Sequence, residues 1–82
     1  MHYEYKPQGV CSRKISFDIE DGKIRNLSFE GGCHGNLQGI GRLVEGMDAS
    51  ECISRVSGIR CGFKSTSCPD QLSKALREAV GE

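Results

Sequence analysis

The sequence contains no tryptophan, and its only aromatic residues are three Phe and two Tyr among 82 residues. It has no excess of either charge, since eleven Lys and Arg balance eleven Asp and Glu, and no run of like charge exceeds two. A nucleic-acid partner is therefore not expected, because phosphate binding needs a basic excess on one face. No segment is long and apolar enough to span a bilayer, and the first ten residues lack the apolar stretch of a secretory signal. These absences predict a cytoplasmic protein without nucleic-acid or membrane partners.

Cysteine is the residue type that the sequence does have in number, with five in one small domain spanning residues 1–82. A chain of this length buries only about 60% of its unfolded surface or a little more, so a metal, disulfides or a partner often supplements the core. In a cytoplasmic protein, an odd set of five cysteines indicates metal binding or redox chemistry rather than a disulfide framework.

Residues 10–30 have the pattern of a β-hairpin. Apolar and polar residues alternate in the first half, which is typical of a half-buried strand. Asp21-Gly22 follows as a two-residue turn, because both residue types tolerate positive φ. In the return strand the apolar residues change from even-numbered to odd-numbered positions. This change predicts one extra residue, a β-bulge, near Arg25-Asn26. The residues before the hairpin favour a further short edge strand.

Helical periodicity predicts three helices in the second half, at residues 36–46, 49–57 and 69–80. We expect Asn36 to cap the first helix and Asp48 to cap the second through a capping box. Pro69 suits the first turn of the last helix, and Gly81 suits its end. This order of elements predicts an α+β domain with the helices on one face of a small antiparallel sheet.

Four cysteines lie at boundaries between predicted elements, where side chains from distant segments can converge: Cys11, Cys33, Cys61 and Cys68. Cys52 instead lies in the apolar stripe of a helix and is predicted to be a buried core residue. Four thiolates suit a tetrahedral metal site, which tolerates a range of loop lengths between its ligands. The spacings of 22, 28 and 7 residues contain no Cys-x-x-Cys pair, so independent thiols or disulfides remain alternatives.

Glycines flank the predicted ligands and would let backbone amides approach sulfur. Gly32 and Gly35 lie on either side of Cys33 and His34, and Gly62 follows Cys61. His34 is an alternative ligand or a proton donor beside the site. The stretch "GGCHGN" lacks the lysine-Ser/Thr pair of a P-loop and the Rossmann spacing, so a phosphate site is not supported there. No Ser-His-Asp or Cys-His-Asn arrangement is supported, and no catalytic residue is assigned.

The stretch "TSCPDQL", with "GGCHGN" and "YKPQGVCS" upstream, resembles the TSCPD domain family over essentially the whole chain, and the motif is complete at residues 66–70. In that family the domain occurs alone in small four-cysteine proteins and at the C-terminus of adenosylcobalamin-dependent ribonucleotide reductases. The resemblance implies a metal-binding module, with zinc as the metal, associated with ribonucleotide reduction and deoxynucleotide supply. It implies no active site, because the catalytic barrel and cobalamin-binding region of the reductase are far longer than this chain.

Cys11, Cys33 and Cys68 also match, in order and context, the three cluster cysteines of the U-type iron–sulfur scaffold proteins. Two positions depart from that pattern: Arg13 replaces an aspartate, and Ser67 replaces a histidine. The aspartate helps to make the scaffold's cluster labile, so its absence, with an additional thiol nearby, implies a scaffold-like fold that holds a stable structural metal.

Two classes of function follow from these observations. The first is a zinc-binding module without independent catalysis that docks on a ribonucleotide reductase or another protein. The second is an iron–sulfur cluster carrier or a thiol redox protein. Thiolates suit both zinc and iron–sulfur clusters, so the ligand set does not separate the two.

Overall fold

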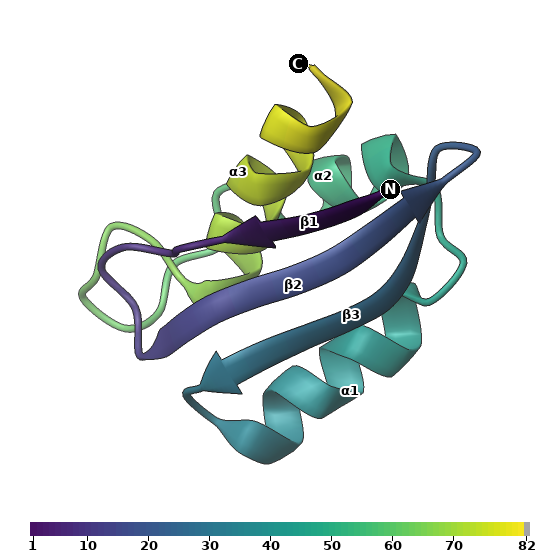
Figure 1. Ribbon diagram of the computed structural model, residues 1–82. Helices are drawn as coiled ribbons and strands as arrows, with labels where there is room; N and C mark the ends of the chain where they lie inside the picture. Colours follow the sequence, from purple (N-terminus) through teal and green to yellow (C-terminus); the bar gives the residue numbers. More distant parts are fainter. Residues whose placement is uncertain (82) are drawn as a thin grey trace.

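The computed structural model describes residues 1–81, in which three strands are followed by three helices (Figure 1). The strands are β1 His2–Tyr5, β2 Ser12–Glu20 and β3 Lys23–Gly31. The helices are α1 His34–Val44, α2 Ala49–Val56 and α3 Cys68–Val80. The strands form one antiparallel sheet in the order β1-β2-β3, with the two pairings running between chain neighbours. The predicted α+β class is confirmed.

The β2–β3 hairpin turns at Asp21-Gly22, as predicted, and both residues have positive φ, 53° and 75°. The register shifts between the Ser16–Ser28 and Asp18–Arg25 pairs, where β3 has one residue more than β2. Asn26 lies in this segment with a φ of 55°. The β-bulge inferred from the change in apolar parity is therefore present at the predicted position. A further shift near the start of β2 was not predicted.

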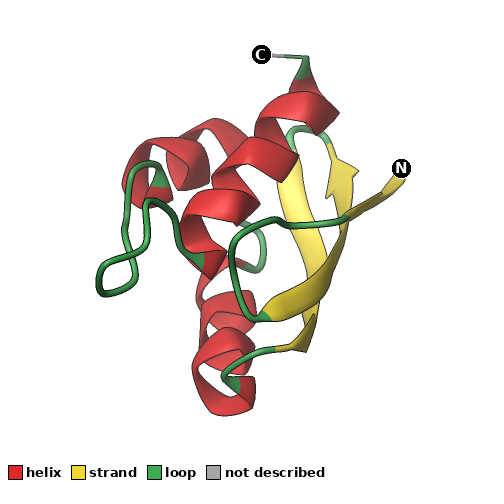
Figure 2. Ribbon diagram, turned by 90° about the vertical axis from the view of Figure 1, so that its left-hand side faces the viewer, coloured by secondary structure: helices red, strands yellow, loops and turns green. Residues whose placement is uncertain are grey.

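The three helices cover one face of the sheet (Figure 2). Alternation along β2 and β3 directs apolar side chains to that face, where they meet the apolar stripes of α2 and α3. The largest fully buried side chains are Phe17, Ile15, Ile24, Leu72 and Leu76. Tyr3 of β1 stacks on Phe17 with 5.6 Å between ring centroids, so the edge strand also packs on this core.

Helix α1 begins two residues earlier than predicted. Its N-cap is Cys33, and no side chain caps the helix, so the expected role of Asn36 is wrong. Gly31 and Gly32 both have positive φ and turn the chain directly from β3 into the helix. The first turn then closes through the N–H of Leu37, which donates to the Cys33 carbonyl at 2.9 Å.

Helix α2 begins after Asp48, as predicted, but the predicted capping box does not form. The Asp48 side chain makes no capping bond and instead lies 3.3 Å from Lys23 Nζ. The N–H of Ala49 donates to the carbonyl of Gly22 at 2.9 Å. The hairpin turn thus satisfies one of the N-terminal N–H donors of α2.

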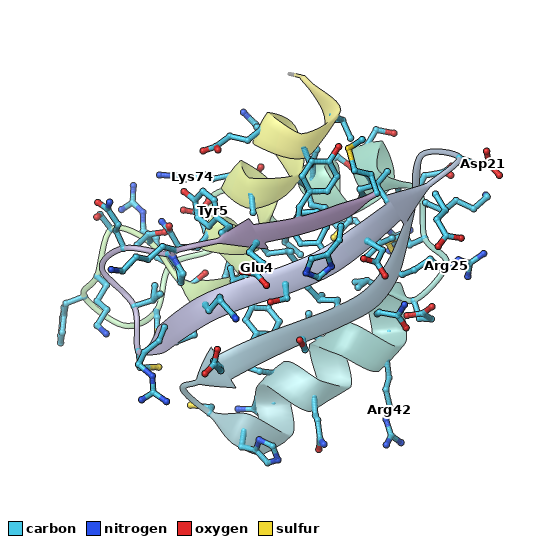
Figure 3. All side chains as sticks on the ribbon, viewed as in Figure 1. Glu4, Tyr5, Asp21, Arg25, Arg42 and Lys74 are labelled. Carbon is cyan, nitrogen blue, oxygen red and sulfur yellow. The ribbon has the colours of Figure 1, made fainter. Side chains whose placement is uncertain are left out.

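The other face of the sheet is polar and is not covered by helices. Figure 3 shows Glu4 on this face, where Lys14 lies 3.7 Å from Glu4 and 3.4 Å from Glu30. His2 Nδ1 lies 2.7 Å from Asp18 Oδ1, and this hydrogen bond raises the pKa of His2. Among the described residues, no helix has the length and apolar character needed to cross a membrane.

Candidate functional site

The antiparallel pairing of β2 with β3 brings two of the predicted ligands to the same end of the sheet. Cys11 directly precedes β2 and Cys33 lies two residues after β3, while the Ser12–Gly31 pair ends the ladder between them. Cys68 is the first residue of α3, and Cys61 lies in the loop between α2 and α3. We call this region, around Cys11, Cys33, Cys61 and Cys68, the cysteine end. It faces the viewer in Figure 2.

Close contacts tie the elements of the cysteine end together. A Cβ atom added to Gly32 would lie 3.3 Å from Cys11 Sγ and 2.9 Å from Leu37 Cδ1, so this position accepts no side chain without rearrangement. Ser12 Oγ lies 3.2 Å from Cys68 Sγ in a buried contact. Residues next to Cys11 and Cys33 are thus packed closely, and α3 is held against the start of β2.

The thiols at this end differ in exposure. Cys11, Cys33 and Cys61 are exposed, whereas Cys68 is 9% exposed, and all four are free thiols. Within residues 1–81 the side chains of His, Cys, Asp and Glu form no group of three or more that is already arranged to hold a metal ion. The four-cysteine ligand set therefore remains a prediction. Its members lie in segments at one end of the molecule, but their side chains are not clustered around one position.

Cys52 is separate from this set, as predicted. It lies on the buried side of α2 with no exposed surface and belongs to the main hydrophobic core. Burial disfavours the charged thiolate and raises the pKa of the Cys52 thiol. This environment suits a core residue and not a ligand.

Ser67 is the N-cap of helix α3. Its Oγ accepts the N–H of Asp70 at 3.1 Å and donates to the carbonyl of Ile59 at 2.6 Å. Pro69 occupies the first turn and Gly81 ends the helix with a φ of 79°, as predicted. Sequence reasoning missed the role of Ser67, although Ser67-x-x-Asp70 has the spacing of a capping box.

Asp70 anchors the loop that precedes the helix. Its carboxylate accepts the hydroxyl of Thr66 at 2.5 Å and the backbone N–H of Gly58 at 2.7 Å. These two hydrogen bonds, that of Thr66 first, lower the pKa of the Asp70 carboxyl, because they stabilise its charged form. Asp70 is 8% exposed, so a buried carboxylate joins both ends of the loop between α2 and α3.

Gln71 extends this network to the N-terminal part of the chain. Its Nε2 donates to Thr66 Oγ1 at 2.9 Å, and its Oε1 accepts the N–H of Gln8 at 3.1 Å. A Cβ atom added to Gly9 would lie 3.3 Å from Thr66 Cγ2. The loop before β2 and the loop before α3 therefore lie against each other at the cysteine end.

The loop before α3 turns back at its tip through two backbone hydrogen bonds. The N–H of Cys61 donates to the Thr66 carbonyl at 3.1 Å, and the N–H of Lys64 donates to the Cys61 carbonyl at 3.0 Å. Gly62 has a φ of 58° in this turn, and Phe63 at the tip is fully exposed. The turn requires the positive φ of Gly62. The roles predicted for Gly62, His34, Gly32 and Gly35 beside the metal ligands stay predictions.

The sequence model of the family described as "TSCPD domain" matches residues 2–80. The chain belongs to this family. The comparisons with curated proteins and with solved structures find no match.

The five residues that give the TSCPD family its name have distinct roles in this chain. Thr66, Ser67 and Asp70 use their polar side chains to hold the loop and to begin the helix. Pro69 lies in the first turn, where a missing N–H has no consequence. Cys68 is the motif residue with a thiol, and its Sγ contacts Ser12 Oγ at the start of β2 and makes no hydrogen bond within the loop.

Proposed function

We propose that this TSCPD domain is a zinc-binding module in which Cys11, Cys33, Cys61 and Cys68 are the ligands. The observation that supports the proposal is that the segments bearing these four cysteines meet at one end of the molecule, with Cys52 apart in the core. Four thiolates are the donor set of closed structural zinc sites, in which the metal is tetrahedral and no position is open for a substrate.

The cysteine end fits such an ion in the type and location of its side chains. Three of the thiols are exposed and so free to turn toward an ion, while Cys68 is fixed at the start of α3. Bringing four sulfurs to about 2.3 Å from one ion requires the exposed side chains to close in. Metal binding of this kind contributes directly to folding free energy, because no site exists in the unfolded chain.

The first prediction is that the protein binds one zinc ion per chain. The protein should be purified anaerobically under reducing conditions and its metal content measured by elemental analysis. Cobalt substitution should then give the absorbance of tetrahedral thiolate coordination, because cobalt accepts the same ligands and is coloured. A brown protein with iron and sulfide would instead indicate a cluster carrier, and a colourless protein without stoichiometric metal would contradict the zinc site.

We also propose that the module docks on a ribonucleotide reductase. Membership of the TSCPD family supports this, because the family resemblance links the domain to the adenosylcobalamin-dependent enzymes. Calorimetric titration of the purified zinc-loaded protein against such a reductase should give saturable binding. A titration without heat change at several temperatures would contradict docking and leave the zinc site unaffected.

A further inference from the structure

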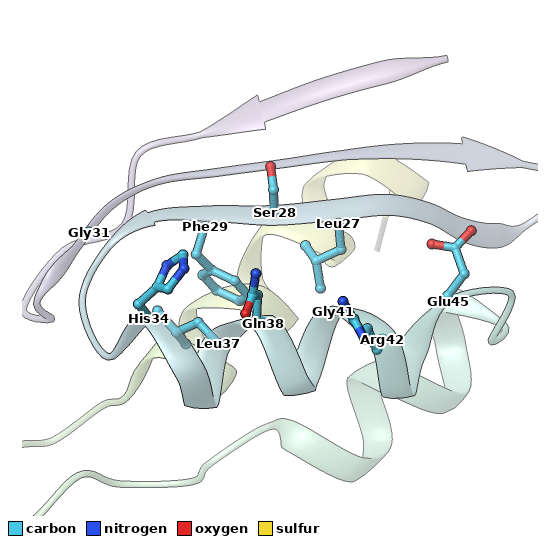
Figure 4. Close-up of a pocket in the computed structure, with 10 residues that line it drawn as sticks. All are labelled: Leu27, Ser28, Phe29, Gly31, His34, Leu37, Gln38, Gly41, Arg42 and Glu45. Atoms are coloured by element: carbon cyan, nitrogen blue, oxygen red, sulfur yellow. The ribbon is translucent and has the colours of Figure 1, made fainter.

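A groove lies between β3 and α1, on the side of the molecule away from α3 (Figure 4). Its volume is about 470 Å³, which is within the range of about 300–1,000 Å³ typical of small-molecule sites. Leu27 and Phe29 point from β3 toward the helix and, with Leu37 of α1, give the groove an apolar floor. We call this space the α1–β3 groove.

The helical wall of the groove carries a row of polar side chains. His34, Gln38 and Arg42 follow one another at intervals of four residues, so they lie along the same side of α1. In the described part of the chain, none of the three makes a side-chain hydrogen bond or an ion pair. With a rise of about 1.5 Å per residue, the row extends about 12 Å along the groove.

Glu45 lies at the end of the groove beyond Arg42, and its carboxylate already has partners. Glu45 Oε1 accepts the N–H of Asn26 at 2.9 Å, and Glu45 Oε2 lies 3.8 Å from Arg25 Nη1. The negative charge of Glu45 is thus engaged by the strand, whereas the guanidinium of Arg42 is not. Among residues 1–81, Arg42 therefore provides a positive charge without an ion-pair partner on the lining of the groove.

The strand side of the groove excludes one class of occupant. An extended peptide would need to add to the outer edge of β3, but α1 covers that edge at Gly41. A Cβ atom added to Gly41 would lie only 2.9 Å from the carbonyl oxygen of Leu27. The close approach of helix to strand leaves no room for another strand at this point.

We propose that the α1–β3 groove binds a small organic anion, with its carboxylate or phosphate on Arg42 and its apolar body over Leu27 and Phe29. Arginine matches both anionic groups by paired N–H donors. A bare inorganic anion would leave the apolar floor unused, and a neutral apolar molecule would leave Arg42 unused. Gln38 and His34 offer hydrogen bonds to a polar group further along the ligand.

The proposal is tested by amide NMR titration of the full chain with benzoate and with phenyl phosphate. Inorganic phosphate and benzyl alcohol serve as probes that lack the apolar body and the charge, respectively. We expect saturable shifts of the Leu27, Phe29 and Gly41 amides with at least one aromatic anion, and weaker, non-saturating shifts with the other two probes. The stronger of the two anions identifies carboxylate or phosphate as the preferred group.

Arg42→Gln should weaken this binding about tenfold or more, the size expected for loss of a charge-assisted hydrogen bond. Lys74→Gln is the matched control, because it removes the same charge from an exposed position on α3, on the opposite side of the molecule (Figure 3). It should change the affinity by less than about twofold, the scale of a distant exposed charge in salt. The proposal is overturned if no probe saturates, if inorganic phosphate binds as well as the aromatic anions, or if both variants weaken binding equally.

Discussion

Replacing Cys68 by serine should remove the bound zinc and destabilise the protein at the same time. Cys68 is the least exposed of the four proposed ligands and lies at the start of α3, where the motif network fixes the backbone. Structural zinc sites have apparent binding free energies of about 10–16 kcal/mol, and this free energy contributes to folding. Zinc content by elemental analysis and thermal unfolding of the same samples measure the two effects together.

The other cysteines make this prediction specific. Cys11→Ser, Cys33→Ser and Cys61→Ser should also lower the zinc content, less completely where His34 or water takes the vacant position. Cys52→Ala is the matched control, because Cys52 is fully buried in the core. It should cost about 1 kcal/mol of unfolding free energy and leave the zinc content unchanged.

Two results would contradict this assignment. If Cys61→Ser keeps its zinc while Cys52→Ala loses it, the fourth ligand is assigned wrongly. If serine at each of the four positions leaves metal content at the wild-type level, the cysteine end does not hold the metal.

Replacing Asp70 by alanine should strongly destabilise the protein, although Asp70 is a polar residue outside the hydrophobic core. The substitution removes the acceptor for Thr66 Oγ1 and for the N–H of Gly58. Hydrogen bonds to a charged group each contribute about 1.5–3 kcal/mol, and their donors are left without a partner. We therefore expect a loss of about 3 kcal/mol in unfolding free energy, measured by urea denaturation.

Asp48→Ala is the control for this loss. Asp48 also lies at a helix N-terminus, but its side chain makes no capping bond and has only an exposed ion pair with Lys23. Such pairs contribute about 0–1 kcal/mol, so this variant should unfold nearly like the wild type. Equal losses in the two variants would show that the buried network around Asp70 has no special role.

The contribution of Asp70 should also depend on pH in a defined direction. Because the folded state lowers its pKa, the stabilisation is present above the unfolded pKa of about 3.9 and is lost as the pH falls through the folded value. The difference in stability between the wild type and Asp70→Asn should therefore be constant near neutral pH and shrink below about pH 4. A difference that grew on acidification would contradict the assigned charge state.

The hairpin was predictable from sequence because all of its signals are local. The alternation of apolar and polar residues defines the strands, and Asp21-Gly22 supplies the positive φ values of the turn. The shift of the apolar residues from even to odd positions indicates the extra residue in β3. The start of α1 was not predictable in the same way. It depends on how Gly31 and Gly32 turn the backbone, and glycine permits several turns.

The candidate site was also predictable only in part. The cysteines were expected to lie near one another because element boundaries meet at sheet ends, and the β2–β3 pairing supports this for Cys11 and Cys33. The bonds from Asp70 to Gly58 and from Gln71 to Gln8 were not foreseen. They join segments that come together only after packing, so no local pattern in the sequence reports them.

The burial of Cys52 gives the protein an internal reference for chemical modification. Thiolates react with alkylating reagents, so exposed thiols are modified before a buried thiol whose pKa is raised by burial. Cys11, Cys33 and Cys61 can react in the folded protein, whereas Cys52 becomes accessible only when α2 separates from the core. Counting modified cysteines by mass therefore distinguishes an empty but folded cysteine end from an unfolded chain within one sample.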